Sequence, residues 1–274
     1  MQVLSSRGAL QMSSSARLSP RDSVFTTLVW NGGSKIADFN KHMNRLAEHA
    51  QRLRIKLPET TETDIRRILK TLKIDDKNEL IPQKMIRISY TPDDIEPIKI
   101  ESRDMSLRNI IGEAVTKQAP YWSKSATGCK HGDWFPYIEA IDSARISGAD
   151  FTLLIRDFKI IDAGQATPVV LDVDGVAYFP KPSDGAVRSI TLDSIIEQII
   201  EQGIPIKEGN LNERMVSRAR EMVIIGTGVG VCKIESIDGV EFLEPSDTLF
   251  EISRNALDQH YANPNTWTDM EAES

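Results

Sequence analysis

The chain has 274 residues, of which 40% are hydrophobic and 27% are charged, and its formal net charge is −7. This composition is ordinary for a globular protein. The acidic balance argues against a nucleic-acid-binding surface, and the apolar runs are too short to cross a bilayer, so we expect neither nucleic acid nor membrane as a partner. Two cysteines, Cys129 and Cys232, are too few for a disulfide framework and lack zinc-ligand spacing, so we expect a reducing compartment and no metal.

Residues 1–21 are an N-terminal extension of unusual composition. It contains no acidic residue, and Arg7, Arg17 and Arg21 lie among six serines. An organelle transit peptide has this composition, and so does a disordered or poorly packed start, which is the commoner case. The expected location is the cytoplasm, or the lumen of a chloroplast or mitochondrion if the segment is a transit peptide.

Residues 22–120 are predicted to form a small α/β domain. Runs of β-branched and aromatic residues indicate strands, and apolar residues at helical spacing indicate helices. The predicted elements are strands over 23–30, 84–90 and 98–101, a tight turn over 31–33, and helices over 38–53 and 61–72. Met43, Leu46, Ala47, Ala50 and Leu53 are the predicted apolar face of the first helix. Thr61 is the predicted cap of the second helix.

Residues 121–274 are predicted to form a large domain, which the polar segment 102–126 connects to the small one. The predicted elements are a helix over 133–147, strands over 151–155, 169–173 and 176–179, a helix over 191–202, and a strand over 222–231 that runs into a glycine-rich turn. Trp134, Ile138, Ile141 and Ala144 line one side of the first of these helices. The two segments together indicate a two-domain α/β (α+β) protein.

Two segments of the large domain have backbone suited to an anion. Gly226 to Gly230 form a glycine-rich turn after an apolar strand, whose open backbone can approach a phosphate, although most such turns are only turns. Ser189 to Thr191 open a helix, and a helix start offers free N–H groups to an anion, although a routine cap is the commoner explanation.

Basic side chains at two places in the sequence are also candidates for a functional role. His42, Arg45, His49 and Arg52 fall on one side of a helix, a stripe that by itself indicates a solvated face. Lys130 lies just before an apolar helix, and a lysine in a partly dry pocket has a lowered pKa and can form a Schiff base. Most lysines do nothing of the kind, so Lys130 alone predicts little.

Taken in order, these segments resemble the fold-type IV pyridoxal 5′-phosphate (PLP) enzymes, the class IV aminotransferases. That family includes branched-chain and D-amino acid aminotransferases and 4-amino-4-deoxychorismate lyase. The strand 24–28, the turn 31–32 and the segment 41–46 resemble the family's opening strand, turn and "H-x-x-R-L" helix. The resemblance implies that Arg45 contacts the cofactor phosphate.

The run that follows Lys130 resembles the segment of the family that carries the catalytic lysine. Trp134 and Pro136 follow it, and Gly148-Ala149-Asp150 stand at the family's interval from the lysine. The resemblance implies that Lys130 is the catalytic residue, which holds the cofactor as a Schiff base and moves the proton at the substrate Cα. Lys124 is a nearby rival that breaks this register.

The carboxylate that pairs with the pyridine nitrogen is a glutamate in most of the family, and Asp162 stands there in this chain. A charged partner keeps the ring nitrogen protonated, so that the ring can act as an electron sink. Aspartate can do this although it is one methylene shorter. Asp157 is the competing carboxylate, but it lies too early in the pattern.

The remaining cofactor contacts are implied for the phosphate. Residues 185–191 resemble the family's "L-x-G-I-T-R" turn, with Ser189 at its glycine and Leu192 at its arginine, and they assign Ser189, Ile190 and Thr191 to the phosphate. Gly226 and Thr227 resemble the last family element, where the threonine closes the phosphate site. The resemblance covers residues from about 22 to 239.

Departures from the family bear on the substrate. The "F-E-T" strand reads Phe25-Thr26-Thr27 here, which is closer to the deoxychorismate lyases, so Thr26 is a predicted substrate residue. The loop 91–97 is acidic where the D-amino acid enzymes carry arginines, and we expect it to repel a second substrate carboxylate.

Three functions remain open. The first is a transaminase that acts on an amino acid and a 2-oxo acid. The second is 4-amino-4-deoxychorismate lyase, which Thr26 favours. The third is a cofactor-binding relative with weak or no transaminase activity, which the altered Asp162 and Ser189 favour. The resemblance also implies a homodimer.

Overall fold

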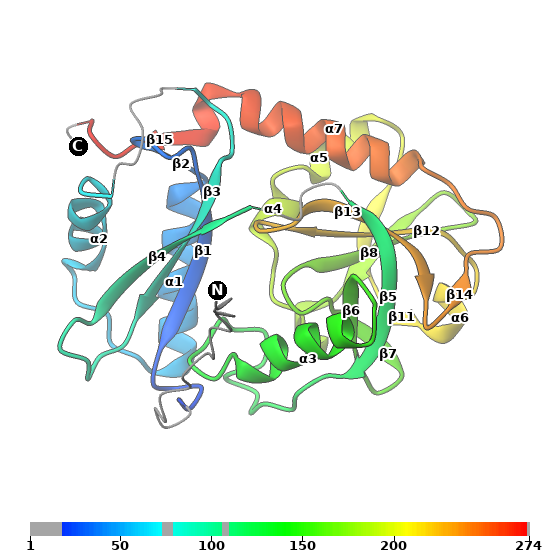
Figure 1. Ribbon diagram of the computed structural model, residues 1–274, viewed down its shortest axis with the longest axis horizontal. Coiled ribbons are helices and arrows are strands. Elements are labelled where there is room, and N and C mark those ends of the chain that lie inside the picture. Colours follow the sequence, from blue (N-terminus) through cyan, green and yellow to red (C-terminus); the bar gives the residue numbers. More distant parts are fainter. Residues whose placement is uncertain (1–17, 73–78, 106–109, 273–274) are drawn as a thin grey trace, which may run out of the picture.

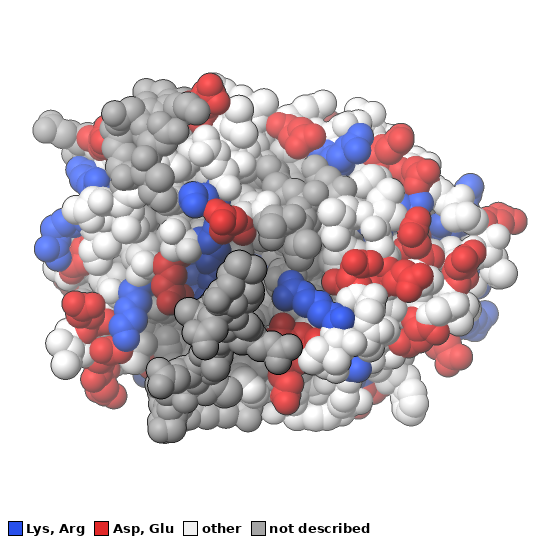
Figure 2. All heavy atoms as spheres, in the orientation of Figure 1, with Lys and Arg blue, Asp and Glu red and all other residues white. Residues whose placement is uncertain are grey.

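The computed structural model describes residues 18–72, 79–105 and 110–272. These residues form two sheets with helices against them (Figure 1), which confirms the predicted mixed α/β class. No helix within these ranges is long and apolar enough to cross a membrane. On the face drawn in Figure 2, acidic and basic side chains are interspersed.

The smaller sheet is antiparallel, and among the described residues it has five strands in the order β15-β2-β1-β3-β4. They are β1 (Val24–Trp30), β2 (Lys35–Ala37), β3 (Lys84–Tyr90), β4 (Ile98–Asp104) and β15 (Trp267–Asp269). Helices α1 (Phe39–Leu53) and α2 (Thr61–Leu69) lie beside this sheet (Figure 1). The predicted strands and helices of this region are therefore confirmed.

Strand β1 separates two environments because alternate side chains point to opposite faces. Val24, Leu28 and Trp30 pack with α1 in one core. Phe25 and Val29, on the other face, belong to cores shared with the large sheet. This alternation decides which side chains of β1 can reach the space between the two sheets.

The larger sheet is mixed, and the described part of the chain gives it ten strands in the order β10-β9-β8-β12-β13-β5-β6-β7-β11, with β14 beside β13. They are β5 (Ile111–Gln118), β6 (Phe151–Arg156), β7 (Lys159–Asp162), β8 (Thr167–Asp172), β9 (Ala177–Pro180), β10 (Ile206–Gly209), β11 (Leu211–Asn212), β12 (Ala219–Gly226), β13 (Gly230–Ile237) and β14 (Val240–Glu241). The sheet curls into a near-barrel, because β7 and β11 approach β8 and β9. Strand β5 already lies in this sheet and β15 returns to the small one, while the domain boundary at residue 120 stays a prediction.

Five helices and two short 3-10 helices are described after β5. They are α3 (Phe135–Ile146), α4 (Ile190–Asp193), α5 (Ile196–Glu201), α6 (Glu213–Val216), α7 (Thr248–Ala262), η1 (Pro182–Asp184) and η2 (Pro264–Thr266). Helix α3 confirms the predicted helix over 133–147. Trp134, just before that helix, and Ala144 within it are buried as expected, but Ile138 is 42% exposed.

The structure corrects several local predictions. The helix over 191–202 divides into α4 and α5, and the strand over 222–231 turns back at 227–229 to form the β12–β13 hairpin. The segment 102–126 contains β5. Ala47 is exposed. Thr61 is not the cap of α2, since Thr60 precedes the helix and the Thr61 hydroxyl donates to the Pro58 carbonyl at 2.6 Å.

Helix α7, which the sequence did not suggest, links the two sheets. At its start, the buried Glu221 of β12 accepts hydrogen bonds from the backbone N–H groups of Leu249 and Phe250, at 2.9 and 2.6 Å. Near its end, His260 Nε2 lies 2.8 Å from a carboxylate oxygen of Asp38, which precedes α1. The helix runs across the top of both sheets in Figure 1.

Candidate active site

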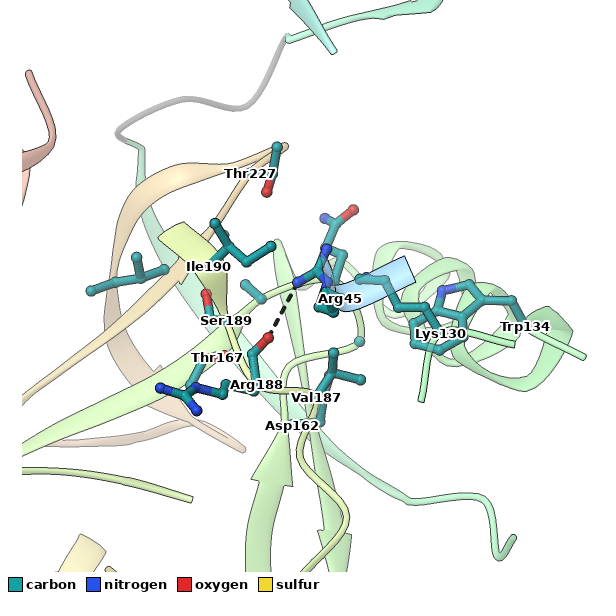
Figure 3. Close-up of a pocket in the computed structure, with 15 residues that line it drawn as sticks. Arg45, Lys130, Trp134, Asp162, Thr167, Val187, Arg188, Ser189, Ile190 and Thr227 are labelled. Atoms are coloured by element: carbon teal, nitrogen blue, oxygen red, sulfur yellow. Dashed lines mark hydrogen bonds between the residues drawn. The ribbon is translucent and has the colours of Figure 1, made fainter. Parts of the chain in front are cut away.

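A cavity lies between the two sheets (Figure 3). Helix α1 contributes Arg45, the segment before α3 contributes Lys130 and Trp134, and β7 ends in Asp162 beside it. The segment 187–190, leading into α4, and the turn at Gly226 and Thr227 complete the wall. Residues far apart in the sequence thus meet at one place.

Lys130 projects into this cavity from a stretch without regular secondary structure. Its amine lies 5.2 Å from the centre of the Phe25 ring and 4.9 Å from that of Trp134, so two aromatic side chains flank it. Burial lowers the pKa of the Lys130 amine to about 7, with the Arg45 guanidinium acting in the same direction. A substantial neutral fraction is therefore present near neutral pH, and a neutral amine is a nucleophile and a base.

The approach of Lys130 to the cavity depends on a glycine. Gly128 has φ +72°, and a Cβ on it would lie 2.9 Å from the Ala186 carbonyl oxygen. A side chain there would force the lysine segment away from the segment leading into α4.

Asp162 is the carboxylate of the cavity and is buried, with 7% of its surface exposed. Burial raises the pKa of its carboxyl to about 6, against the effects of Lys130 and of backbone N–H groups that include those of Gly164 and Val187. A buried carboxylate that faces a cavity is suited to a cationic or N–H-bearing group of a bound molecule.

Arg45 is the buried cation of the cavity. One nitrogen of its guanidinium donates to the Arg188 carbonyl at 3.2 Å and the other to the Thr26 hydroxyl at 2.9 Å. Burial lowers its pKa to about 10. Among the described residues no carboxylate forms an ion pair with it, and its Nε has no hydrogen-bond partner. A buried guanidinium in this condition fits an anionic group such as a phosphate.

The other predicted phosphate contacts lie around Arg45. Ser189, Ile190, Gly226 and Thr227 line the cavity. The Ser189 hydroxyl accepts the Leu192 N–H at 3.2 Å, so it caps α4. Thr191 lies behind the wall, with its hydroxyl 3.2 Å from that of Thr227. A Cβ on Gly226 would lie 2.8 Å from the Gln165 carbonyl oxygen, so the turn keeps its close approach only with glycine.

Thr26 does not line the cavity. It lies on the α1 face of β1, fully buried, with its hydroxyl 2.9 Å from His42 Nδ1 and from an Arg45 nitrogen. Since Arg45 can only donate, the hydroxyl proton is directed at the ring nitrogen of His42. Thr27, its neighbour, points to the other face and lines a second chamber.

The stripe on α1 is not a solvated face. His42, Arg45 and His49 are buried, because β1 and the segment before Lys130 cover this side of the helix. The two rivals lie away from the cavity: Lys124 is exposed, and Asp157 stands in the turn between β6 and β7 with φ 49°.

A second chamber opens beside the first and shares Lys130, Trp134, Gln165 and Thr227 with it. Its wall on the small sheet includes Arg87 and Arg103. The acidic loop 91–97 does not line it, so the charge that faces this space is the opposite of the one expected.

Arg87 is a functional candidate that the sequence analysis missed. Its guanidinium carbon lies 3.7 Å from the centre of the Phe25 ring. Burial lowers its pKa, and Arg103 adds to the effect. Within the described part of the chain no carboxylate makes an ion pair with it. The sequence of β3 could have predicted this position. Ile86, Ile88 and Tyr90 form the apolar face of the strand, so Arg87 must point to the opposite face.

Comparison with known proteins gives this site a family. The profile of the Amino-transferase class IV family matches residues 23–237. The chain belongs to the class IV aminotransferases, whose members use PLP.

Individual relatives agree with this placement. A Methanocaldococcus jannaschii protein, provisionally named a branched-chain-amino-acid aminotransferase, is 23% identical over 210 residues, 73% of each chain. Two similar folds are at lower identity. A hypothetical aminotransferase from Mycobacterium tuberculosis in its PLP-bound form has TM-score 0.72 and 14% identity, covering 89% of this chain and 90% of that one; it is also known bound to alpha-ketoglutarate and PMP. A Legionella pneumophila structure, provisionally named 4-amino-4-deoxychorismate lyase, has TM-score 0.72 and 16% identity, covering 91% and 96%.

Proposed function

We propose that this chain is a PLP-dependent transaminase that moves an amino group between an amino acid and a 2-oxo acid, with Lys130 as its catalytic residue. The observation that carries this proposal is the convergence of Lys130, Arg45 and Asp162 on one cavity in a class IV aminotransferase. These three side chains meet the three chemical demands of the cofactor, which are an amine, a cation for the phosphate and a carboxylate for the ring nitrogen.

The residues around the cavity fit the cofactor. Arg45, whose Nε has no hydrogen-bond partner and which forms no ion pair among the described residues, would hold the phosphate, helped by backbone N–H groups of Ile190 and Thr191 and by the Thr227 hydroxyl. Ser189 and Gly226 would shape that end of the site. Asp162 would face the pyridine nitrogen. We assign Thr26 to this end as well, acting through Arg45 and not on the substrate.

When bound, PLP supplies an aldehyde that forms a Schiff base with amines and a ring that withdraws electrons from the substrate Cα. Lys130 then has two tasks. Its neutral amine would hold the cofactor, and the same amine, once free, would accept the proton that leaves the substrate Cα. Phe25 and Trp134 flank the amine and keep it close to the cavity. Asp162 would supply the negative charge that keeps the ring nitrogen of the cofactor protonated.

The second chamber would take the substrate. Every amino acid or 2-oxo acid carries a carboxylate, and Arg87 and Arg103 face this space. Arg87 lacks a carboxylate partner among the described residues, so it is the better placed to bind one from a substrate. The same cations suit aminodeoxychorismate, and the lyase reaction is therefore the alternative to be tested. We also propose that the chain forms a homodimer, which sedimentation would test.

The proposal is tested by reducing the protein with borohydride in the presence of PLP and mapping the labelled peptide. Cofactor should be fixed on Lys130. Lys130→Ala should lose the label and, because a positioned general base contributes about 10²- to 10⁴-fold, should lose transamination by at least that factor. Lys124→Ala is the control and should behave as wild type. Label on another lysine would refute the assignment.

An amino-donor screen with pyruvate and 2-oxoglutarate, run beside an aminodeoxychorismate assay, separates the functions. Donor-dependent turnover supports the transaminase. Release of pyruvate from aminodeoxychorismate alone supports the lyase. Labelling of Lys130 without turnover in either assay would leave the cofactor-binding relative.

A further inference from the structure

One face of helix α1 carries both Arg45 and the side chains that contact the segment around Lys130. His42, Arg45, His49 and Arg52 share a face of the helix. Arg45 and His42 meet the Thr26 hydroxyl, while Arg52 donates to the Thr127 carbonyl. His49 lies between these groups and contacts Lys130 itself.

The backbone of Lys130 is held by two hydrogen bonds. Its N–H donates to His49 Nδ1 at 3.1 Å, and its carbonyl accepts the Phe25 N–H at 3.2 Å. Lys130 lies outside any helix or strand, so no regular hydrogen-bond ladder holds it. Its N–H partner is therefore a side chain 81 residues away, and that side chain is 97% buried, being 3% exposed.

The His49 imidazole can accept the Lys130 N–H in only one tautomer. Because the donor is a backbone N–H, His49 Nδ1 must be unprotonated, and the ring proton sits on Nε2. Burial lowers the pKa of His49 to about 3, and Arg45, Lys130, Arg52 and His131 all act in the same direction. The ring stays neutral, and the acceptor is present, across the pH range in which a class IV aminotransferase would work.

We propose that His49 is a positioning residue for Lys130, because its neutral imidazole accepts the Lys130 N–H and fixes the point from which the reactive amine extends. This inference rests on the proposed function only in calling that amine reactive. The neighbouring Arg45 sits on the same helix, so α1 sets the spacing between the lysine backbone and the phosphate-binding cation. Displacement of a reacting group by about 1 Å can cost 10²-fold in rate.

The contact is tested first without the cofactor, by measuring amide hydrogen exchange of Lys130 in two matched variants. His49→Asn places an acceptor oxygen at the δ position, where Nδ1 is. His49→Gln carries its oxygen one bond further out. Both are neutral and polar, so the pair separates the acceptor from general packing. Loss of the bond in His49→Gln should raise Lys130 exchange by about tenfold, and His49→Asn should restore most of the protection.

The consequence for the cofactor is tested by the rate at which PLP is captured and fixed on Lys130 by borohydride. This rate should fall by about tenfold in His49→Gln and recover in His49→Asn. Asn44→Leu, on the exposed face of the same helix, is the control and should change neither measurement.

Two results would overturn the inference. Wild-type protection of the Lys130 amide in His49→Gln would show that the bond does not hold the lysine. Equal losses in His49→Asn and His49→Gln would show that His49 acts through packing and not as an acceptor. Fixation of PLP on a different lysine, with the exchange pattern as expected, would refute the proposed function while the contact of His49 with Lys130 stood.

Discussion

The two walls of the site hold their polar groups in different ways. The small-sheet wall presents cations, Arg45, Arg87 and Arg103, and the first two have no ion-pair partner within the described ranges. The large-sheet wall presents Asp162, which accepts hydrogen bonds from backbone N–H groups, and the hydroxyl groups of Ser189 and Thr227, which contact Leu192 N–H and the Thr191 hydroxyl. A cation that has no carboxylate partner can bind an anionic ligand. Groups that already form hydrogen bonds with their neighbours fix the shape of the site and the direction from which a ligand is contacted. Lys130 comes from the segment between β5 and α3, and its backbone carbonyl accepts the N–H of Phe25 in the small sheet, so it lies between the two walls.

The largest effect is expected at Asp162, the carboxylate of the large-sheet wall. Asp162→Asn keeps the shape of the side chain and removes its charge, so a ring N–H loses the partner that keeps it protonated. Removal of one preorganised electrostatic group typically costs about 10²- to 10³-fold, and we expect a loss of that size in the single-turnover rate of Cα proton removal. PLP should still bind, because Arg45 on the small-sheet wall is unchanged. Asp162→Glu, the control, should retain activity, and equal rates in wild type and Asp162→Asn would show that Asp162 does not act on the ring.

The complementary change removes the buried cation. Charged hydrogen bonds contribute about 1.5–3 kcal/mol each, so Arg45→Ala should weaken PLP binding by about one to two orders of magnitude. The effect should appear in the dissociation constant more than in the rate of the bound enzyme. Equilibrium dialysis against PLP measures it, and an unchanged affinity would remove Arg45 from the phosphate site.

A smaller effect is expected at the substrate chamber. Arg87→Leu should raise KM by about tenfold for acidic and apolar substrates alike, the cost of one charged hydrogen bond to the carboxylate that every substrate carries. Arg103 is paired with Glu101 at 3.6 Å and is more exposed, so Arg103→Leu should have the weaker effect. An unchanged KM in Arg87→Leu would mean that Arg87 does not bind the substrate carboxylate.

The smallest effect is a pH dependence of stability in the cofactor-free protein. The pKa of Lys130 is lowered from 10.5 to about 7, so the unfolded chain binds more protons between these values and the free energy of unfolding should rise with pH there. The pKa of Asp162 is raised from 3.8 to about 6, so stability should fall as pH rises through that window. In denaturant titrations, Lys130→Met should remove the change of stability between about pH 7 and 10.5. Asp162→Asn should remove the change between pH 3.8 and about 6. A slope that survives in the matching variant would assign it to another group.

The sequence predicted most elements that follow simple patterns, but it missed helix α7 and the break in the predicted helix over 191–202. Strands β1 and β3 and helix α1 were predictable because their apolar residues have the period of the element. Helix α7 also has apolar residues at helical spacing, including Leu249, Leu257 and Tyr261, but no motif drew attention to it. The division of the predicted helix over 191–202 at Ser194 and Ile195 has no strong breaker to announce it.

The site was predictable through the family pattern and not through local chemistry. The positions of Lys130, Arg45 and Asp162 followed from the resemblance, and the structure brings them together. The direction of Thr26 did not follow, because it depends on which face of β1 packs on α1. The burial of His49 could not be read from a stripe of basic residues, since a stripe that is covered and one that is solvated have the same spacing.

Helix α7 has a consequence for how the molecule comes apart. Its first turn is fastened to the large sheet by Glu221, and its last turn to the start of α1 by the contact of His260 with Asp38. Neither sheet can lose its structure without freeing one end of this helix and exposing the apolar side chains that it covers. The small and large sheets should therefore melt together, in one cooperative transition, although the chain places them on either side of a cavity.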